Sequence, residues 1–122
     1  MNQNLKILYV EDEEDIRDEM LEILSLDFEE IKIAANGQEG LQIFKEFHPD
    51  IIISDIQMPL LDGISMAKEI LAIDPKMKIV FTTAFNEESQ LKRVKDLGIQ
   101  DYITKPVNIN KLLDTIHKIT SS

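Results

Sequence analysis

The sequence places polar side chains within two residues of the ends of short apolar runs, and their types suit phosphoryl transfer. The residues concerned are Glu11, Asp12, Asp55, Thr83 and Lys105. Three carboxylates that lie close together repel one another unless a hard cation joins them, and Mg²⁺ takes one or two carboxylates together with water and phosphate oxygens. If these side chains meet in the fold, they form a Mg²⁺ site beside a hydroxyl and an ammonium group.

Asp55 is the residue of this set that we expect to act as the nucleophile and to form an aspartyl phosphate. It stands alone after its apolar run, whereas Glu11 and Asp12 begin an acidic stretch that is better suited to holding the ion. Lys105 would place a mobile positive charge on the phosphoryl group, and Thr83 would donate a hydrogen bond to it. The set therefore predicts a phosphoacceptor with Mg²⁺ as its cofactor.

These residues can meet only if the apolar runs before them are parallel strands. Five runs are too short for helices and rich in β-branched or aromatic residues, which predicts strands over Ile7–Val10, Ile31–Ala34, Ile51–Ile53, Ile79–Phe81 and Tyr102–Ile103. A stretch with helical periodicity follows each run. The alternation predicts an α/β fold, a doubly wound (βα)₅ parallel five-stranded sheet with helices on both faces and its site at the carboxyl ends of the strands.

Charge and composition exclude several classes of protein. The 122 residues suit a single domain, which we take as residues 1–122, and they carry a net charge of −10. Residues 1–30 hold 11 acids and 2 bases, so we expect no direct binding to nucleic acid or to a membrane surface. No apolar stretch approaches the roughly 20 residues of a membrane span. Because the chain also has no Cys, we expect a cytoplasmic location.

The chain resembles the receiver (CheY-like) domain of two-component response regulators, a flavodoxin-like fold, over essentially its full length. The motifs that carry the resemblance are Glu11-Asp12, the segment from Asp55 to Asp62-Gly63, Thr83-Ala84, and Tyr102 to Lys105-Pro106. The resemblance implies strand order 2-1-3-4-5 and a cis Lys105–Pro106 bond. It further implies that Asp55 is phosphorylated by the phosphohistidine of a sensor histidine kinase or phosphotransfer protein.

The resemblance also implies a ligand set and a switch. Mg²⁺ would be held by Asp12, Asp55 and the backbone carbonyl of Gln57. Glu11, where the family more often has Asp, would act through water. On phosphorylation Thr83 would move toward the phosphate and Tyr102 would turn inward, remodelling the surface of the fourth helix, fifth strand and fifth helix.

The same resemblance, or local pattern, suggests roles for further residues. In the family, residues at the positions of Gln57 and Phe85 tune how fast the acyl phosphate hydrolyses. Asp62, which precedes a stretch with helical periodicity, is predicted to cap the third helix. Tyr102 could also be a plain core residue of an edge strand, an alternative that the sequence leaves open.

Two other functions remain to be weighed on the same architecture. A phosphatase of the haloacid-dehalogenase type needs a second acid two residues after its nucleophile, where this chain has Gln57. A nucleotide-binding module needs a Gly- or Ser/Thr-rich phosphate cradle after the first strand, where the acidic stretch beginning at Glu11 would repel the ligand. We therefore expect no enzyme in the usual sense, but a signalling domain that catalyses only its own phosphotransfer and dephosphorylation.

The partners implied are the phosphodonor and either a separate output protein or a C-terminal effector domain beyond Ser122. Met1 favours a natural start, whereas the final Ser121-Ser122 says little about a natural stop. We expect a monomer. A phosphorylation-dependent dimer through the basic residues at 92, 93 and 95 and through Asp101 stays open, although the fifth helix lacks the arginine that the DNA-binding subfamily usually has there.

Overall fold

The computed structural model describes residues 4–84 and 88–121, and it contains one parallel five-stranded sheet. The strands are β1 (Lys6–Val10), β2 (Glu30–Ala34), β3 (Ile51–Asp55), β4 (Ile79–Thr83) and β5 (Tyr102–Thr104). Their order in the sheet is β2-β1-β3-β4-β5, and every neighbouring pair is parallel. This confirms the predicted fold class and strand order, with β2 and β5 at the edges.

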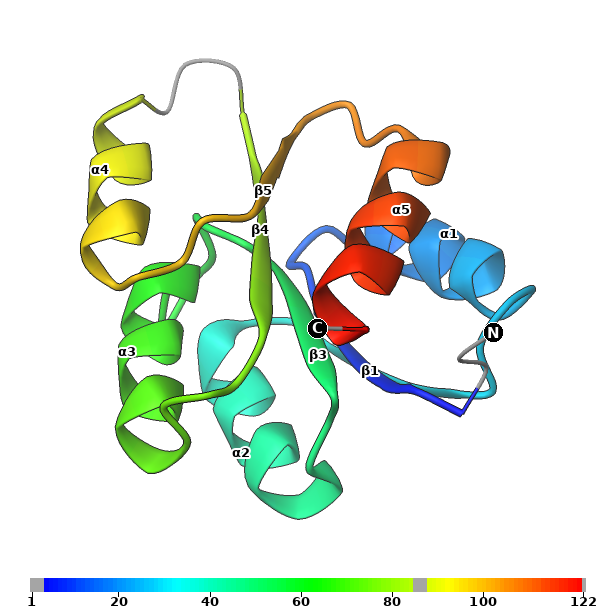
Figure 1. The fold of residues 1–122 in the computed structure, drawn as a ribbon, viewed down its shortest axis with the longest axis horizontal. Coiled ribbons are helices and arrows are strands. Elements are labelled where there is room, and N and C mark those ends of the chain that lie inside the picture. Colours follow the sequence, from blue (N-terminus) through cyan, green and yellow to red (C-terminus); the bar gives the residue numbers. More distant parts are fainter. Residues whose placement is uncertain (1–3, 85–87, 122) are drawn as a thin grey trace.

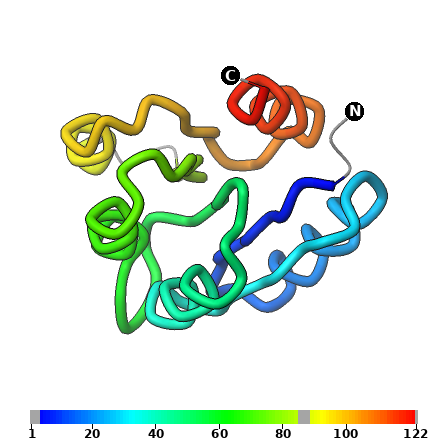
Figure 2. Tube along the Cα trace, turned by 60° about the horizontal axis from the view of Figure 1, so that its bottom comes forward, coloured from blue at the N-terminus to red at the C-terminus, as the bar shows by residue number. Residues whose placement is uncertain are grey.

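A helix follows each strand, and the helices cover both faces of the sheet (Figure 1). They are α1 (Glu14–Leu24), α2 (Gly37–Phe47), α3 (Gly63–Ile73), α4 (Glu88–Asp96) and α5 (Ile109–Thr120). In Figure 1, α1 and α5 lie on one side of the strands, and α2, α3 and α4 lie on the other. The tube in Figure 2 shows the same arrangement from another direction, with the chain winding around the central strands.

Side-chain caps mark where three of the helices begin. Asn36, Asp62 and Asn108 each accept a hydrogen bond from the backbone N–H three residues later, at the starts of α2, α3 and α5 respectively. Such caps satisfy backbone donors that the first helical turn leaves unpaired. The cap at Asp62 confirms the role predicted from the sequence.

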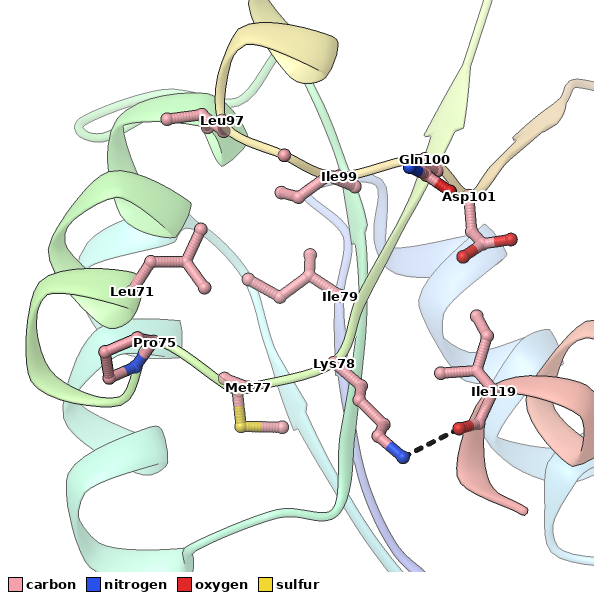
Figure 3. A pocket seen from close by; sticks show the side chains of 11 residues that line it. Leu71, Pro75, Met77, Lys78, Ile79, Leu97, Ile99, Gln100, Asp101 and Ile119 are labelled. Atoms are coloured by element: carbon pink, nitrogen blue, oxygen red, sulfur yellow. Dashed lines mark hydrogen bonds between the residues drawn. The ribbon is translucent and has the colours of Figure 1, made fainter. Parts of the chain in front are cut away.

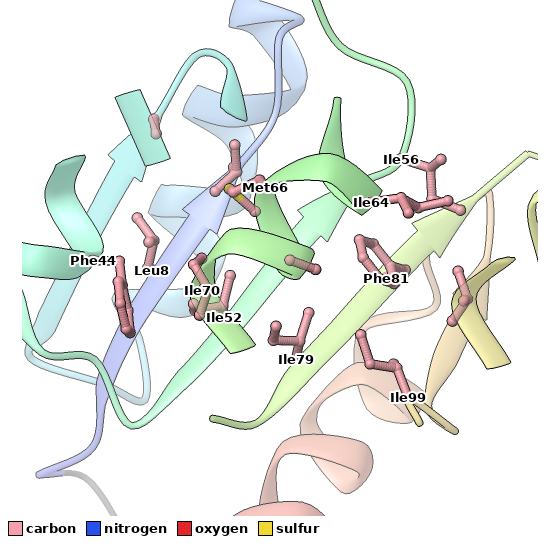
Figure 4. Packing of buried hydrophobic residues seen from close by; sticks show 14 residues of the cluster. Leu8, Phe44, Ile52, Ile56, Ile64, Met66, Ile70, Ile79, Phe81 and Ile99 are labelled. Atoms are coloured by element: carbon pink, nitrogen blue, oxygen red, sulfur yellow. The ribbon is translucent and has the colours of Figure 1, made fainter. Parts of the chain in front are cut away.

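The core divides into two layers because successive strand residues point to opposite faces of the sheet. Leu8, Ile52 and Phe81 face α2 and α3, and Figure 4 shows them packed with Phe44, Met66 and Ile70. Ile7, Ile53 and Val80 face α1 and α5 and pack with Leu24 and Ile116. Both faces of the central strands are thus buried, as their uninterrupted apolar runs predicted.

All five strands are longer than the sequence predicted, β3 and β4 by two residues each and the others by one, and the extra residues are polar. β3 continues through Ser54 to Asp55, and β4 continues through Thr82 to Thr83. The extension follows from pairing, since Ser54 lies in register with Phe81 and Asp55 with Thr82. The prediction that these strands ended at Ile53 and Phe81 was wrong because apolar character stops before the backbone ladder does.

The loop between β3 and α3 is held by backbone contacts. The N–H of Gly63 donates to the carbonyl of Ile56 at 2.7 Å, and the N–H of Gly37 donates to the carbonyl of Leu61 at 2.9 Å. Leu60 in this loop has a φ of 68°, and its side chain is exposed. A left-handed conformation costs an L-residue about 1–2 kcal/mol. The surrounding contacts therefore impose the path of this loop.

No helix within residues 4–84 and 88–121 is both long enough and apolar enough to cross a membrane.

Gly63→Ala is expected to lower the free energy of unfolding by about 2–3 kcal/mol, because the added methyl group would overlap the backbone carbonyl oxygen of Asp55. Gly40→Ala is the matched control and is expected to lose less stability, since its methyl group would meet only side chains, Sδ of Met66 at 2.8 Å and Cγ2 of Val10 at 3.1 Å, and Ala favours the helix by about 1 kcal/mol. Urea unfolding measures both variants. Equal losses would contradict the importance of the contact between Gly63 and the end of β3.

Thr82→Val is expected to raise the free energy of unfolding by about 1 kcal/mol. The Thr82 hydroxyl is buried and has no hydrogen-bond partner in the described part of the chain, and valine replaces it with a methyl group of the same shape. Thr104→Val, on the exposed face of β5, serves as control and is expected to change stability by less than about 0.5 kcal/mol. A loss of stability in Thr82→Val would show that the hydroxyl has a partner in solution.

Candidate functional site

The carboxyl ends of β1, β3 and β5 bring charged side chains together at one edge of the sheet. Lys105, directly after β5, places its Nζ 2.9 Å from Oδ2 of Asp55, the last residue of β3. The same Nζ lies 3.6 Å from Oε1 of Glu11, directly after β1. One ammonium group therefore joins two carboxylates that are more than forty positions apart in the sequence.

Asp12 completes a group of three carboxylates with Glu11 and Asp55. One oxygen from each of the three lies within 4.8 Å of the others. Glu11 and Asp55 are buried, with 1% and 7% of their surfaces exposed, whereas Asp12 is exposed. The group thus has a buried floor and an open side toward solvent.

Glu11 carries the clearest electrostatic perturbation of the site. Its pKa is raised to about 7, first by burial and further by the charge of Asp55, although a hydrogen bond from the Glu13 N–H and the charge of Lys105 oppose the shift. Its Oε1 is buried and accepts no hydrogen bond from any described residue. A buried acceptor without a donor, in a cluster of like charges, is a place where a cation would be stabilised.

Neighbouring groups respond to the same concentration of negative charge. Burial alone would lower the pKa of Lys105, but its hydrogen bond to Asp55 and the charges of Asp55 and Glu11 outweigh burial and raise it. Burial, then Glu11 and Asp55, raise the pKa of the Tyr9 hydroxyl. Lys105 is therefore charged and Tyr9 neutral over the physiological pH range.

The donor set fits a hard divalent cation such as Mg²⁺. Three carboxylates supply oxygen ligands, Oε1 of Glu11 accepts no hydrogen bond within the described residues, and the exposed side at Asp12 leaves room for water. Mg²⁺ prefers such a partly hydrated site with few protein carboxylates. The single ammonium of Lys105 does not balance three carboxylates.

The remaining predicted residues lie around this centre. Thr83 ends β4 and is buried, and its carbonyl accepts a hydrogen bond from the Lys105 N–H at 2.7 Å. Gln57 is exposed, two residues after Asp55. Tyr102, in edge strand β5 and in register with Phe81, has 38% of its surface exposed. The Lys105–Pro106 bond is cis, as predicted, and Phe85 lies outside the described residues.

Arg17 at the site was not anticipated from the sequence. Its Nη1 donates to the backbone carbonyl of Glu11 at 2.9 Å and reaches the carbonyl of Asp12 at 3.5 Å. One feature of the sequence could have indicated this role: Arg17 is the one basic residue in the acidic stretch between positions 11 and 22.

Two hollows differ in their relation to this centre. A groove of about 540 Å³ reaches from Glu11 and Lys105 along α1 to the start of α5, with Ile16, Met20 and Val107 in its wall. A smaller hollow of about 200 Å³ lies at the other end of β4, where Leu71, Met77 and Ile99 line it and the Lys78 ammonium donates to the carbonyl of Ile119 (Figure 3). The larger groove is the one continuous with the charged site.

Comparison with known proteins agrees with this geometry. Residues 7–117 match the family model described as "Response regulator receiver domain". The chain is 34% identical over 117 residues to the chemotaxis protein CheY of Halobacterium salinarum, covering 96% of this chain and 98% of the relative.

Further similarities extend to a longer protein and to a solved structure. The regulatory protein AtoC of Escherichia coli is 32% identical over 107 residues, covering 88% of this chain and 23% of AtoC. A response regulator receiver domain from Clostridium thermocellum superposes with a TM-score of 0.90 at 30% identity, covering 96% of this chain and 94% of that one. The fold, the charged edge and these similarities together establish that the chain belongs to the CheY-like receiver domains of two-component response regulators.

Proposed function

We propose that this receiver domain accepts a phosphoryl group on Asp55, in a Mg²⁺-dependent reaction, from the phosphohistidine of a sensor histidine kinase or phosphotransfer protein. The observation that carries the proposal is the position of Lys105 Nζ, 2.9 Å from Asp55 Oδ2 and beside three converging carboxylates. A nucleophile, a fixed cation and a site for a divalent ion are the parts that phosphoryl transfer to a carboxylate requires.

The two oxygens of Asp55 differ in their surroundings. Oδ1 accepts the N–H of Ile56 at 2.8 Å, which orients the carboxylate, and Oδ2 lies against the Lys105 ammonium. A carboxylate oxygen of Asp55 would attack the phosphorus. A P–O bond would form while the donor's P–N bond breaks, and the electron pair would leave with the imidazole.

The surrounding residues would divide the remaining work. Asp12, Asp55 and the Gln57 carbonyl would hold the ion directly and Glu11 through water, and bound Mg²⁺ would offset the charge of the transferred oxygens. Lys105 would follow the phosphoryl group as a point charge, and Thr83 would donate a hydrogen bond to it.

The consequence of phosphorylation would be a population shift. The modification adds a charge of roughly −2 and three acceptor oxygens beside Thr83 and Lys105. Movement of Thr83 would vacate space for Tyr102, which is partly exposed on β5, so the surface of α4, β5 and α5 would change. That surface would control an output protein or an effector domain in the same chain, with a phosphorylation-dependent dimer as one outcome.

The groove along α1 is the surface on which we propose that the protein phosphodonor docks. Its apolar wall, formed by residues such as Ile16 and Val107, leads directly to Lys105. We propose a cytoplasmic phosphoacceptor that acts on no separate substrate and catalyses only its own phosphotransfer and dephosphorylation.

Asp55→Asn is expected to abolish phosphoryl incorporation from acetyl phosphate and Mg²⁺, because an amide lacks the nucleophilic carboxylate. Intact-protein mass spectrometry measures the modification. Asp50→Asn, at the opposite edge where Asp50 accepts the Lys6 N–H, is the control and should be modified like the unchanged protein. Incorporation that survives Asp55→Asn would rule out this phosphoacceptor.

Asp12→Ala is expected to weaken Mg²⁺ binding about tenfold or more and to slow phosphorylation with it, since it removes one ligand of the three-carboxylate group. Asp15→Ala is the control, because Asp15 is an exposed acid in the first turn of α1. Calorimetric titration with Mg²⁺ gives both affinities. Equal affinities would mean that Asp12 contributes only general negative charge.

A further inference from the structure

Arg17 contacts the backbone on which two of the three carboxylates are mounted. Its Nη1 lies 2.9 Å from the carbonyl oxygen of Glu11 and 3.5 Å from that of Asp12, and its side chain is half-buried. Its own N–H donates to the carbonyl of Glu13 at 2.9 Å, which ties it to the start of α1. The guanidinium thus bridges the helix and the turn between β1 and α1.

The other ties of this turn hold different groups. The N–H of Glu11 donates to the carbonyl of Ala34 at 3.0 Å, and the N–H of Glu13 donates to Oε2 of Glu11 at 3.1 Å. These bonds involve the backbone donors of the turn, whereas Arg17 engages its carbonyl acceptors. Because Asp12 is exposed, the direction of its side chain depends strongly on how the peptide units on either side of it are held.

The positive charge of Arg17 and its hydrogen bonds have opposite expected effects on cation binding. A guanidinium near a cation site repels the cation by Coulomb's law, so charge alone would make Arg17 unfavourable for Mg²⁺ binding. Hydrogen bonds from Arg17 to the two carbonyls have the opposite consequence, because they restrict the turn to one arrangement of its carboxylates. The two effects predict changes of opposite sign when Arg17 is replaced.

We propose that Arg17 is a positioning residue of the metal site: it holds the turn at Glu11 and Asp12 so that their carboxylates converge with Asp55 on one cation. The inference rests on the Mg²⁺ site of the proposed function. Arg17 would act through the backbone carbonyls of Glu11 and Asp12 and not by direct contact with the ion or the phosphoryl group.

Replacement of Arg17 shows whether its loss weakens or strengthens Mg²⁺ binding. Arg17→Met keeps the length of the aliphatic stem and removes the hydrogen bonds, and it is expected to weaken Mg²⁺ binding about tenfold, as loss of other supporting contacts at metal sites does. Arg17→Lys keeps the charge but replaces the Nη1 that makes both contacts with an ammonium on a shorter side chain, so we expect a smaller weakening in the same direction. Tighter binding in Arg17→Met, with unchanged binding in Arg17→Lys, would overturn the proposal and leave only the Coulomb effect.

Arg93→Met is the matched control, because Arg93 lies on α4 and its Nη1 donates to the side chain of Gln90 at 3.1 Å, away from the turn at Glu11 and Asp12. Its Mg²⁺ affinity should equal that of the unchanged protein. Titration calorimetry gives the affinities, and urea unfolding without Mg²⁺ shows whether each variant is folded at the temperature used. If Arg17→Met does not fold, Arg17→Lys and Arg17→Gln carry the same comparison.

The rate of phosphorylation at different Mg²⁺ concentrations distinguishes weakened metal binding from damage to the phosphoacceptor Asp55. With acetyl phosphate as donor, Arg17→Met should be phosphorylated slowly at low Mg²⁺ and at the unchanged rate at saturating Mg²⁺. A defect that persists at saturation would contradict a role confined to metal affinity. If the unchanged protein binds Mg²⁺ but takes up no phosphoryl group, the proposed function fails while the affinity comparison still decides the role of Arg17.

Discussion

Repulsion among three carboxylates at the carboxyl edge of the sheet is the constraint that the rest of the structure has to withstand. Two unit charges about 4 Å apart interact by about 4 kcal/mol at an effective dielectric constant of about 20. Glu11 and Asp55 are buried, so water screens them poorly, and the pKa of Glu11 is raised first by the burial itself and further by the charge of Asp55. Lys105 offsets part of the repulsion through its contacts with both residues. The remainder must be offset by packing elsewhere in the fold.

The parallel sheet meets this requirement because its buried apolar residues, which stabilise the fold, lie apart from the carboxylates at its edge, which destabilise it. Ile7, Ile53 and Val80 and their neighbours are fully buried below the charged edge, and burial of such side chains contributes about 1.5–3 kcal/mol each. All five strands are parallel and end at the same edge, so residues at the ends of β1, β3 and β5 meet without any long loop. The close contacts of Gly63 and Gly37 then hold the loop after β3 against this edge, even though Leu60 adopts an unfavourable left-handed conformation there.

The sequence predicted the fold better than it predicted the details of the site, for identifiable physical reasons. Alternating periodicity was sufficient to predict the (βα)₅ order. The polar residues after the apolar runs were sufficient to predict that Glu11, Asp55 and Lys105 belong to one site. The ends of β3 and β4 were missed because hydrogen-bond ladders continue into polar residues such as Thr82. The contacts of Arg17 were missed because they are made to backbone carbonyls, whose positions no side-chain pattern records.

The existing contact between Lys105 and Asp55 limits how the proposed switch can work. A modification shifts a conformational equilibrium only by the difference in stabilisation between two states, and a nearly complete shift needs about 5 kcal/mol. Lys105 is already paired at 2.9 Å before any phosphoryl group arrives, so it contributes only the difference between two charged partners. A hydrogen bond from the Thr83 hydroxyl to the phosphoryl group would exist only in the phosphorylated state, so its whole free energy would contribute to the difference between the two states. The differential free energy of the switch should therefore come more from Thr83 and the rearrangement around Tyr102 than from Lys105, whose main effect is on the reaction itself.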